Sequence, residues 1–468
     1  MIALIPAEIT CSLESTMMYA ALAKLYALYG DPAQIGWLIT AFTLAAAGSA
    51  AIGGRLGDMF GRRRMLCILL VLSCVGSLLS ASTDDLRVVI AGRILQGMTM
   101  AILPLCFGIL RENLPLDRTA LGVSILGSIF SAMVGIGALL GGLIIDNFEW
   151  QMIFRVSAAM GAISLVAALL VVPRSVPAGV PERLDLAGGL LFVPALAATL
   201  YGVTEGGRQG WMGLPGLYVA AGVTALIFWA RYELRHSHPL LDLRLFRNRQ
   251  IRLVAIGIFL AAVGPMTSSL IIFPLLQQPE WTGTGFGLSA SMAGAIKLPG
   301  ALASGLFILA SGLIMSRVGI RIILLAGTAV TLMGWLGMIF GGHSLWWLVA
   351  LIIFALTPGA GLVNAIAPQV IVQHAPQERI AEATGLLIVI RTMGNSIGAQ
   401  IVAICLATRL VSEPGRGQFP AESAYLVASV VIAFLTIGSG IAFSGLAGRK
   451  SGVVGSTQPE LASVAPRA

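Results

Sequence analysis

The sequence predicts an all-α polytopic membrane protein with fourteen transmembrane helices. Residues of the AVILMFWYC class make up 57% of the 468 positions, whereas charged residues make up only 11%. A water-soluble protein carries about 25% charged residues, and a single soluble domain could not bury this much apolar surface. A bilayer supplies the apolar solvent, because each crossing helix needs about 20 mainly apolar residues.

Apolar runs of suitable length follow one another along the whole chain, separated by short segments that carry Gly, Pro or charged residues. The expected spans lie near residues 3–27, 34–54, 65–82, 87–110, 119–145, 151–172, 186–204, 215–232, 251–273, 288–313, 322–341, 345–370, 382–408 and 423–446.

The distribution of cations supports this order of spans. If the N-terminus lies in the cytoplasm, 20 of the 29 Lys and Arg residues fall in cytoplasmic segments, four in external loops and five inside spans. Because cationic loops resist translocation, this bias predicts a multi-pass protein of the plasma (inner) membrane with both termini cytoplasmic. The formal net charge of +8 is then a topology signal, and we expect no nucleic-acid partner.

Enzyme chemistry is not indicated. The five cysteines lie inside apolar runs, where we expect them to be small packing residues, and the four histidines form no cluster with metal-ligand spacing. The chain contains no nucleotide-binding Gly-rich loop followed by Lys-Ser/Thr, no HExxH and no GxSxG. We therefore expect no catalytic activity, no metal and no cofactor.

A charged segment, GRLGDMFGRRR at residues 54–64, separates the second and third apolar runs. It predicts a cytoplasmic loop between two spans. The segment resembles the loop between the second and third helices of major facilitator superfamily transporters, whose pattern is Gly-x-Leu-x-Asp-Arg-x-Gly-Arg-Lys/Arg, with Met59 at the usual Arg. The resemblance implies a major facilitator fold and is only weakly informative about substrate.

The chain repeats this segment once. Residues 312–321, GLIMSRVGIR, align with residues 54–63 at both glycines and at the last Arg, whereas Ser316 replaces Asp58. Both segments follow the second long run of a half and precede the third, so we expect two six-helix halves related as parallel repeats.

Two further spans lie between the halves. The resulting 6+2+6 order is similar to the fourteen-helix drug:proton antiporters, the DHA2 branch. The expected divisions are an N-terminal bundle at 1–175, a linker with two extra spans and an amphipathic link at 176–250, a C-terminal bundle at 251–447 and a cytoplasmic tail at 448–468.

Three other segments carry the same resemblance. Residues 13–16, LEST, resemble the first-helix motif, with Glu14 at its Asp; residues 93–97, RILQG, followed by Pro104, resemble the fourth-helix motif; and Arg391, Gly394 and Gly398 resemble the thirteenth-helix signature. The resemblance implies proton-driven export.

Glu14 lies mid-span. An ionised carboxylate at the bilayer centre costs about 2.5–3.5 kcal/mol on insertion scales, and removal from water favours the neutral acid. We hypothesise that Glu14 binds the coupling proton and releases it when substrate arrives. The alternative is a structural acid in a permanent ion pair. Glu8, about 600° of helix rotation away, is on a different face and is expected to be an interfacial acid.

Arg93 is always charged, and the resemblance implies that it neutralises Glu14 or relays its proton state. The alternative is a packing role with backbone carbonyls. Gln96, one turn further on, shares its face.

Lys297 lies about ten residues into the tenth span, where the family usually has apolar residues. A buried ammonium needs an acid or a substrate anion nearby, so we hypothesise that it favours anionic, zwitterionic or neutral amphiphiles over dications. The alternative is snorkelling to the outer interface. The expected substrate cavity is formed by six residues: Glu14, Gln96, Lys297, Arg391, Met17 and Met266. For the methionines the alternative is core or lipid contact.

Two further groups have predicted mechanical roles. Asp58, with Gly54, Gly61, Arg62 and Arg63, is expected to form a conformational latch, because an acid there can accept from a neighbouring helix N-terminus. Gly137, Gly141 and Gly142 are expected to allow close helix packing. They fit the antiporter signature Gly-x-x-x-Gly-Pro-x-x-Gly-Gly, but Met133 and Ala138 replace its first Gly and its Pro, which weakens the assignment of antiport.

The sequence therefore predicts proton-driven efflux of amphipathic drugs or toxic metabolites by alternating access. One alternative is a proton-coupled transporter of one specific metabolite, by symport or export. A transport-inactive sensor is disfavoured, because the longest polar segments, 231–250 and 448–468, are short. The expected partners are a small-molecule substrate, protons and membrane lipids, and we expect a monomer.

Overall fold

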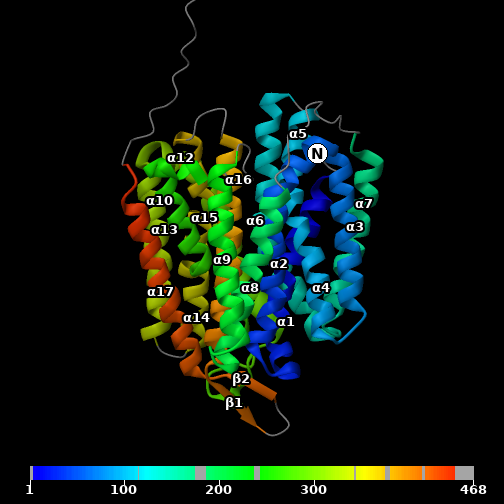
Figure 1. Ribbon diagram of the computed structural model, residues 1–468. Coiled ribbons are helices and arrows are strands. Elements are labelled where there is room, and N and C mark those ends of the chain that lie inside the picture. The colour runs from blue at the N-terminus through cyan, green and yellow to red at the C-terminus, as the bar shows by residue number, and fades with distance from the viewer. Residues whose placement is uncertain are drawn as a thin grey trace, which may run out of the picture.

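The computed structural model describes residues 4–113, 115–173, 186–236, 243–341, 344–374, 380–413 and 417–447. The predicted tail at 448–468 and part of the linker lie outside these residues. Gly54 and Asp58 belong to a described helix, but the Asp58 side chain is not described. Most helices run side by side along one long direction (Figure 1). The strands β1 (Leu410–Glu413) and β2 (Gly417–Pro420) form an antiparallel hairpin at one end, here called the hairpin end. The end near the N-terminus is called the N-terminal end.

The first half contains seven α-helices, of which two form one rod. They are α1 (Ile5–Tyr29), α2 (Pro32–Phe60), α3 (Arg62–Ala81), α4 (Leu86–Gly97), α5 (Ile102–Asn113), α6 (Leu116–Asn147) and α7 (Met152–Val171).

Two helices and a short 3-10 helix follow, and then the last half. They are α8 (Leu186–Gln209), α9 (Leu214–Arg235), the 3-10 helix Leu243–Arg247, α10 (Arg249–Val263), α11 (Ser269–Gln277), α12 (Ala290–Val318), α13 (Ile320–Phe340), α14 (Leu345–Leu351), α15 (Thr357–His374), α16 (Ile380–Ala407) and α17 (Glu422–Ser444).

Ten helical segments of the described chain are long and apolar enough to cross a membrane. Shorter apolar stretches occur at Ala132–Asn147 and Leu191–Gly206. α1 is not among the ten, although it has 25 residues, and it carries Glu8, Glu14 and Lys24. The number of fourteen spans stays a prediction.

Three of the expected spans are each built from two α-helices. The 3-10 segment Met98–Ala101 joins α4 to α5, the 3-10 segment Pro265–Thr267 lies between α10 and α11, and the π-helical segment Ile352–Leu356 joins α14 to α15. Proline explains two of these breaks, because Pro265 and Pro358 cannot donate a backbone hydrogen bond. Such interruptions often occur at functional positions of a helix.

The predicted loop at 54–64 is much shorter than expected. α2 continues to Phe60, and Gly61 alone turns the chain into α3, with φ +91° and ψ 125°. Gly319 makes the same turn between α12 and α13, with φ +87° and ψ 150°. Only glycine adopts this conformation readily, so the two turns support the internal repeat found in the sequence.

The apolar core consists of three clusters. One contains side chains of both halves, from α1, α2, α6, α11 and α16 among others, and extends to the hairpin end. A second lies within the first half, around Leu66, Leu105 and Leu126, and a third joins the linker helices to the last half. The halves therefore share a core toward the hairpin end, and Leu44 of α2 also brings the first half into the third cluster.

Candidate functional site

Three hydroxyl groups surround the carboxylate of Glu14 in the middle of α1. Ser73 Oγ and Ser77 Oγ, from α3, donate to Glu14 Oε1 at 2.5 and 3.3 Å, and Thr99 Oγ1 donates to Oε2 at 3.0 Å. The carboxylate is sealed, since Glu14 is only 2% exposed and all three partners are buried. A hydroxyl can donate or accept, so this cage suits both the ionised and the protonated acid.

Arg93 of α4 ties three helices together through carbonyl groups. Its Nε donates to the backbone oxygen of Leu38 at 3.0 Å, and its Nη1 donates to the backbone oxygen of Glu14 at 2.9 Å. The guanidinium also lies 4.2 Å from the ring centroid of Phe42. Both residues are described by the structure, and no ion pair joins the Arg93 guanidinium to the Glu14 carboxylate.

Gln96 connects Arg93 to the carboxylate indirectly. Arg93 Nη1 donates to Gln96 Oε1 at 3.0 Å, and Gln96 Nε2 donates to Ser77 Oγ at 2.7 Å. Ser77 in turn contacts Glu14. A hydrogen-bonded chain, Arg93–Gln96–Ser77–Glu14, thus replaces the direct ion pair that the sequence left open.

Thr99 can respond to the protonation state of Glu14. Its hydroxyl is within donating distance of Glu14 Oε2, at 3.0 Å, and of the Gln96 carbonyl oxygen, at 2.6 Å. A hydroxyl has one hydrogen, so it donates to one of these at a time. When Thr99 donates to the Gln96 carbonyl oxygen, its own oxygen can accept a hydrogen bond from the O–H group of a protonated Glu14.

Sequence reasoning missed Ser73, Ser77 and Thr99. A signal was present in α3, because Ser73, Ser77 and Ser80 recur at three- and four-residue intervals in an otherwise apolar helix. This spacing places them on one face. Thr99 gave no comparable signal, since its approach to Glu14 depends on where the 3-10 segment Met98–Ala101 lies beside α1.

Glu8 corrects the expectation of an interfacial acid. It is 0% exposed, and neither carboxylate oxygen has a hydrogen-bond partner among the described residues. The apolar cluster of the first half, with side chains from α3, α5 and α7, covers this end of α1. The sequence position near the helix start suggested contact with water, but neighbouring helices remove it.

Two cations of the last half, Lys297 and Arg391, were predicted to line the substrate cavity, and both lie inside the protein. Lys297 is 5% exposed, donates to Ser269 Oγ and lies 5.5 Å from the ring centroid of Phe273, so it does not snorkel. Arg391 is partly buried and donates from Nη1 to Asn364 Oδ1 at 2.7 Å. Within the described chain, neither cation forms an ion pair.

The two methionines of the expected cavity have different environments. Met17 is fully buried in the shared core, and Met266 packs, partly buried, against the cluster of the last half. In this conformation Met17 contacts other helices, so a cavity-lining role for it stays a prediction.

The glycines of α6 lie at two helix contacts. A β-carbon on Gly137 would lie 2.1 Å from Thr16 Oγ1, and one on Gly141 would lie 2.7 Å from the Met17 carbonyl oxygen, both on α1. A β-carbon on Gly142 would lie 2.2 Å from the carbonyl oxygen of Ala290 on α12. These close approaches require glycine.

Asp146 joins the two halves at the hairpin end. Its two carboxylate oxygens accept from the backbone N–H groups of Ala290 and Ser291, each at 2.8 Å. A side chain of α6 thus caps the N-terminus of α12 in the other half, where the helix dipole favours negative charge. At another contact between the halves, Thr40 Oγ1 of α2 donates to Gln400 Oε1 of α16 at 3.0 Å.

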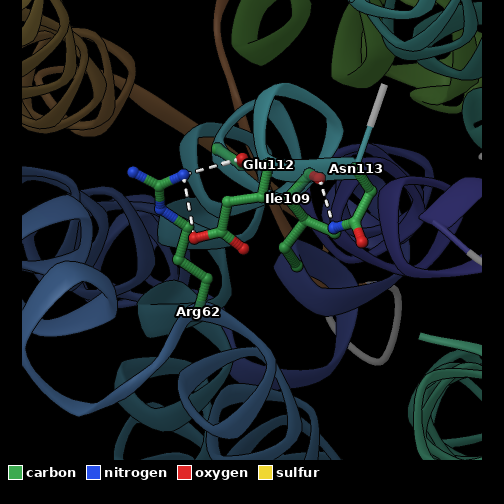
Figure 2. A network of polar contacts seen from close by, with 5 residues as sticks. Arg62, Ile109, Glu112 and Asn113 are labelled. Atoms are coloured by element: carbon green, nitrogen blue, oxygen red, sulfur yellow. Dashed lines mark hydrogen bonds and ion pairs between the residues drawn. The ribbon is translucent and has the colours of Figure 1, made fainter. Parts of the chain in front are cut away.

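The arginines after Gly61 contact helices of their own half. Figure 2 shows the Arg62 side chain extending toward Glu112 of α5. Arg62 Nη1 lies 3.2 Å from Glu112 Oε1 and donates to the Gly108 carbonyl oxygen at 2.7 Å. Arg63 Nη2 donates to the carbonyl oxygen of Leu169 on α7 at 2.5 Å. The latch expected at Asp58 lies outside the described side chains.

Comparison with known proteins identifies the family. Residues 4–399 match the Major Facilitator Superfamily. The chain belongs to the major facilitator superfamily. It is therefore a multi-span, all-helical membrane transporter, as the sequence predicted, whereas the fourteen-helix subfamily and the 6+2+6 order stay predictions.

Relatives of this superfamily member include exporters and a nucleoside transporter. It is 30% identical over 391 residues to the multidrug resistance protein Stp of Mycobacterium tuberculosis, covering 80% of this chain and 69% of the relative. It is 26% identical over 395 residues to the tetracenomycin C resistance and export protein of Streptomyces glaucescens, covering 82% and 71%. It is 29% identical over 399 residues to the uridine/deoxyuridine transporter of Lactococcus lactis, covering 82% of each.

Solved structures of the superfamily have the same fold. The crystal structure of the peptide transporter POT superposes with a TM-score of 0.66 at 16% identity, covering 95% of this chain and 93% of that one. This likeness concerns the fold alone.

Proposed function

We propose that this protein exports amphipathic small molecules, such as drugs or toxic metabolites, in exchange for protons. The observation that carries the proposal is the sealed carboxyl of Glu14 in its cage of three neutral hydroxyls. Because these partners tolerate either protonation state, the acid can take up and release a proton without losing its hydrogen bonds. The names of the multidrug resistance and tetracenomycin export relatives support the direction of transport.

The membrane topology belongs to the same proposal. We place the hairpin end outside and the N-terminal end in the cytoplasm, in the plasma membrane, with fourteen spans in 6+2+6 order and both termini cytoplasmic. The cation bias of the sequence supports this orientation. In the described structure, the contacts at the hairpin end would then close the outer side.

Transport would proceed by rocking of bundles 1–175 and 251–447 about a central site. Loss of the Glu14 proton makes the carboxylate a stronger acceptor, which draws the Thr99 hydroxyl away from the Gln96 carbonyl. Thr99 belongs to the 3-10 segment between α4 and α5, a place where the helix is already interrupted. Proton state is thereby linked to the geometry of this rod, and Arg93 senses it through Gln96 and Ser77.

The decisive experiment uses Glu14→Gln in liposomes with an imposed pH gradient and a panel of cationic, neutral and anionic dyes. We expect the wild type to move at least one dye opposite to protons and the variant to fall to the level of empty liposomes, because an amide cannot release a proton. Ser15→Ala, one residue on and partly buried, is the matched control. Proton-coupled transport by Glu14→Gln would refute the role of this acid.

A second candidate function is proton-coupled transport of one specific metabolite. It is favoured by Lys297 and Arg391, two buried or partly buried cations that form no ion pair in the described chain, because such groups suit a substrate with an anionic or zwitterionic part. The uridine/deoxyuridine relative is compatible with this alternative. Co-directional movement of dye and protons would support symport.

Lys297→Met tests the cation directly. Without the ammonium, we expect efflux of a dicationic dye to rise about tenfold relative to an anionic one, because charge repulsion is removed. Measuring both dyes in the same liposomes gives the ratio. An unchanged ratio would exclude Lys297 from substrate selection.

A further inference from the structure

Glu8 is a buried acid that the mechanism above does not use. It is 0% exposed, and both of its carboxylate oxygens lack a hydrogen-bond partner among the described residues. An ionised carboxylate without partners is very unfavourable away from water, whereas the neutral acid is tolerated. The geometry therefore requires Glu8 to hold a proton in this conformation.

The described side chains around Glu8 are mainly apolar. The first-half cluster contributes mainly apolar side chains from α3, α6 and α7, together with the partly buried thiol of Cys67. On α5, the buried Cys106 thiol belongs to the same cluster as Leu4 and Ala7. On α1 itself, the nearest titratable side chains in the sequence are Cys11 and, further along, Glu14. In the described chain, no Lys or Arg forms an ion pair with Glu8.

Its position is the second observation. Glu14 is sealed, and its side-chain partners all belong to the first half, so its proton needs a route through that half. Glu8 lies six residues closer to the N-terminal end, about 9 Å along the helix, and α1 begins only three residues before it. Between the two acids in the sequence, the buried Cys11 thiol contacts the Met100 sulfur at 3.4 Å. The buried Ser12 hydroxyl lies one turn after Glu8 on the same face of α1, close to its carboxyl group.

We infer that Glu8 is a proton-transfer residue between Glu14 and the N-terminal end of the protein. In a conformation that admits water to that end, neutral Glu8 gives its proton to water and becomes a carboxylate. The proton of Glu14 then passes to Glu8 through water around α1, because the two acids lie on different faces of the helix, and Glu14 is left ionised within its three hydroxyls. This inference rests on the proposed proton coupling at Glu14 and adds a route for the proton.

Infrared spectroscopy tests the protonation of Glu8 without any substrate. Purified wild type and Glu8→Gln are compared at neutral pH in detergent, in the region where the C=O group of a neutral carboxylic acid absorbs. We expect the wild type to show a band that Glu8→Gln lacks and that Glu14→Gln keeps. Identical spectra for wild type and Glu8→Gln would overturn the inference.

Transport measurements test the relay. For the dye that the wild type accumulates, we expect Glu8→Gln to slow pH-driven uptake about tenfold and to leave dye exchange at equal pH unchanged. Glu8→Asp should recover part of the uptake rate. Glu8→Leu, which fits the apolar cluster, should behave like Glu8→Gln. If Glu8→Gln lost pH-driven uptake and exchange equally, Glu8 would have a structural role. If Glu8→Gln kept the wild-type uptake rate, Glu8 would have no role in transport. Either result overturns the proposed proton transfer through Glu8.

The two proposals fail in different ways. If Glu14→Gln still couples dye movement to protons, the proposed function is wrong. If Glu14→Gln is uncoupled but Glu8→Gln behaves as wild type, only the route through Glu8 is wrong.

Discussion

At the scale of single residues, the candidate site depends on neutral hydroxyls and not on a direct ion pair. Glu14 and Arg93 both lie in the centre of the first half, but the guanidinium donates to carbonyl groups of Leu38, Glu14 and Gln96. An ion pair would hold the acid ionised, whereas serine and threonine hydroxyls serve either state. The arrangement keeps a positive charge close by while leaving the proton free to exchange.

Thr99→Val should slow proton-coupled transport about 10- to 100-fold. The substitution keeps the shape of the side chain but removes a hydrogen bond to a charged group, which contributes about 1.5–3 kcal/mol. Dye binding at constant pH should stay within a factor of about two. Thr43→Val is the matched control, because the Thr43 hydroxyl is partly buried and bonds only carbonyls of its own helix. Equal rates for the two variants would contradict a role for Thr99 in coupling.

At the scale of elements, the contacts between halves concentrate on two helix pairs. α6 contacts α12, and α2 contacts α16. At the first pair, Gly142 permits close approach, and the Asp146 carboxylate caps the N-terminus of α12. A helix cap formed between the two halves differs from a cap within one half. It stabilises only the conformation in which the hairpin end is closed, because the two halves must be in contact to form it.

Asp146→Ala should open the hairpin end more often. Loss of a helix cap costs about 0.5–2 kcal/mol, which shifts a two-state equilibrium by roughly 2- to 30-fold. Spin labels replacing the exposed Phe148 and Met292 would report the change as a second, longer distance. Asp85→Ala is the control, because Asp85 caps α4 within the first half. If both variants gave the wild-type distance distribution, the cap would not hold the halves together.

At the scale of the whole molecule, two helical halves flank α8 and α9, and α8 contacts both α2 and α16. The largest core that the two halves share lies toward the hairpin end. Such an arrangement is compatible with rocking about a central site.

Cysteine labelling tests the proposed orientation and the two extra spans together. Trp211→Cys, in the exposed connection between α8 and α9, should react with a membrane-impermeant maleimide added to intact cells. Leu234→Cys, exposed in the last turn of α9, should react only after permeabilisation. Wild type, which has five cysteines, measures the background. The reverse pattern would invert the topology, and equal labelling would mean that α9 does not cross the membrane.

Composition and pattern were sufficient to predict the class of protein. The apolar runs and the motif at residues 54–64 identified an all-helical superfamily transporter, because long apolar stretches have few stable states outside a bilayer. The internal repeat could also be recognised in the sequence. Both copies keep a glycine, Gly61 and Gly319, because the turn at that position has a backbone conformation that other residues avoid. Glu14 was recognisable as an acid in an apolar run.

What surrounds Glu14, Glu8 and Lys297 depended on contacts between helices far apart in the chain. Ser73 and Thr99 reach Glu14 across 59 and 85 residues, and no local spacing reports such a distance. Glu8 was predicted to be an interfacial acid, because its burial is due to helices α3, α5 and α7, which lie far away in the sequence. Snorkelling of Lys297 was excluded only by its contacts with Ser269 and Phe273 in the folded protein. The sequence determines the polarity of each side chain, but the helices that pack around a side chain determine whether it contacts water.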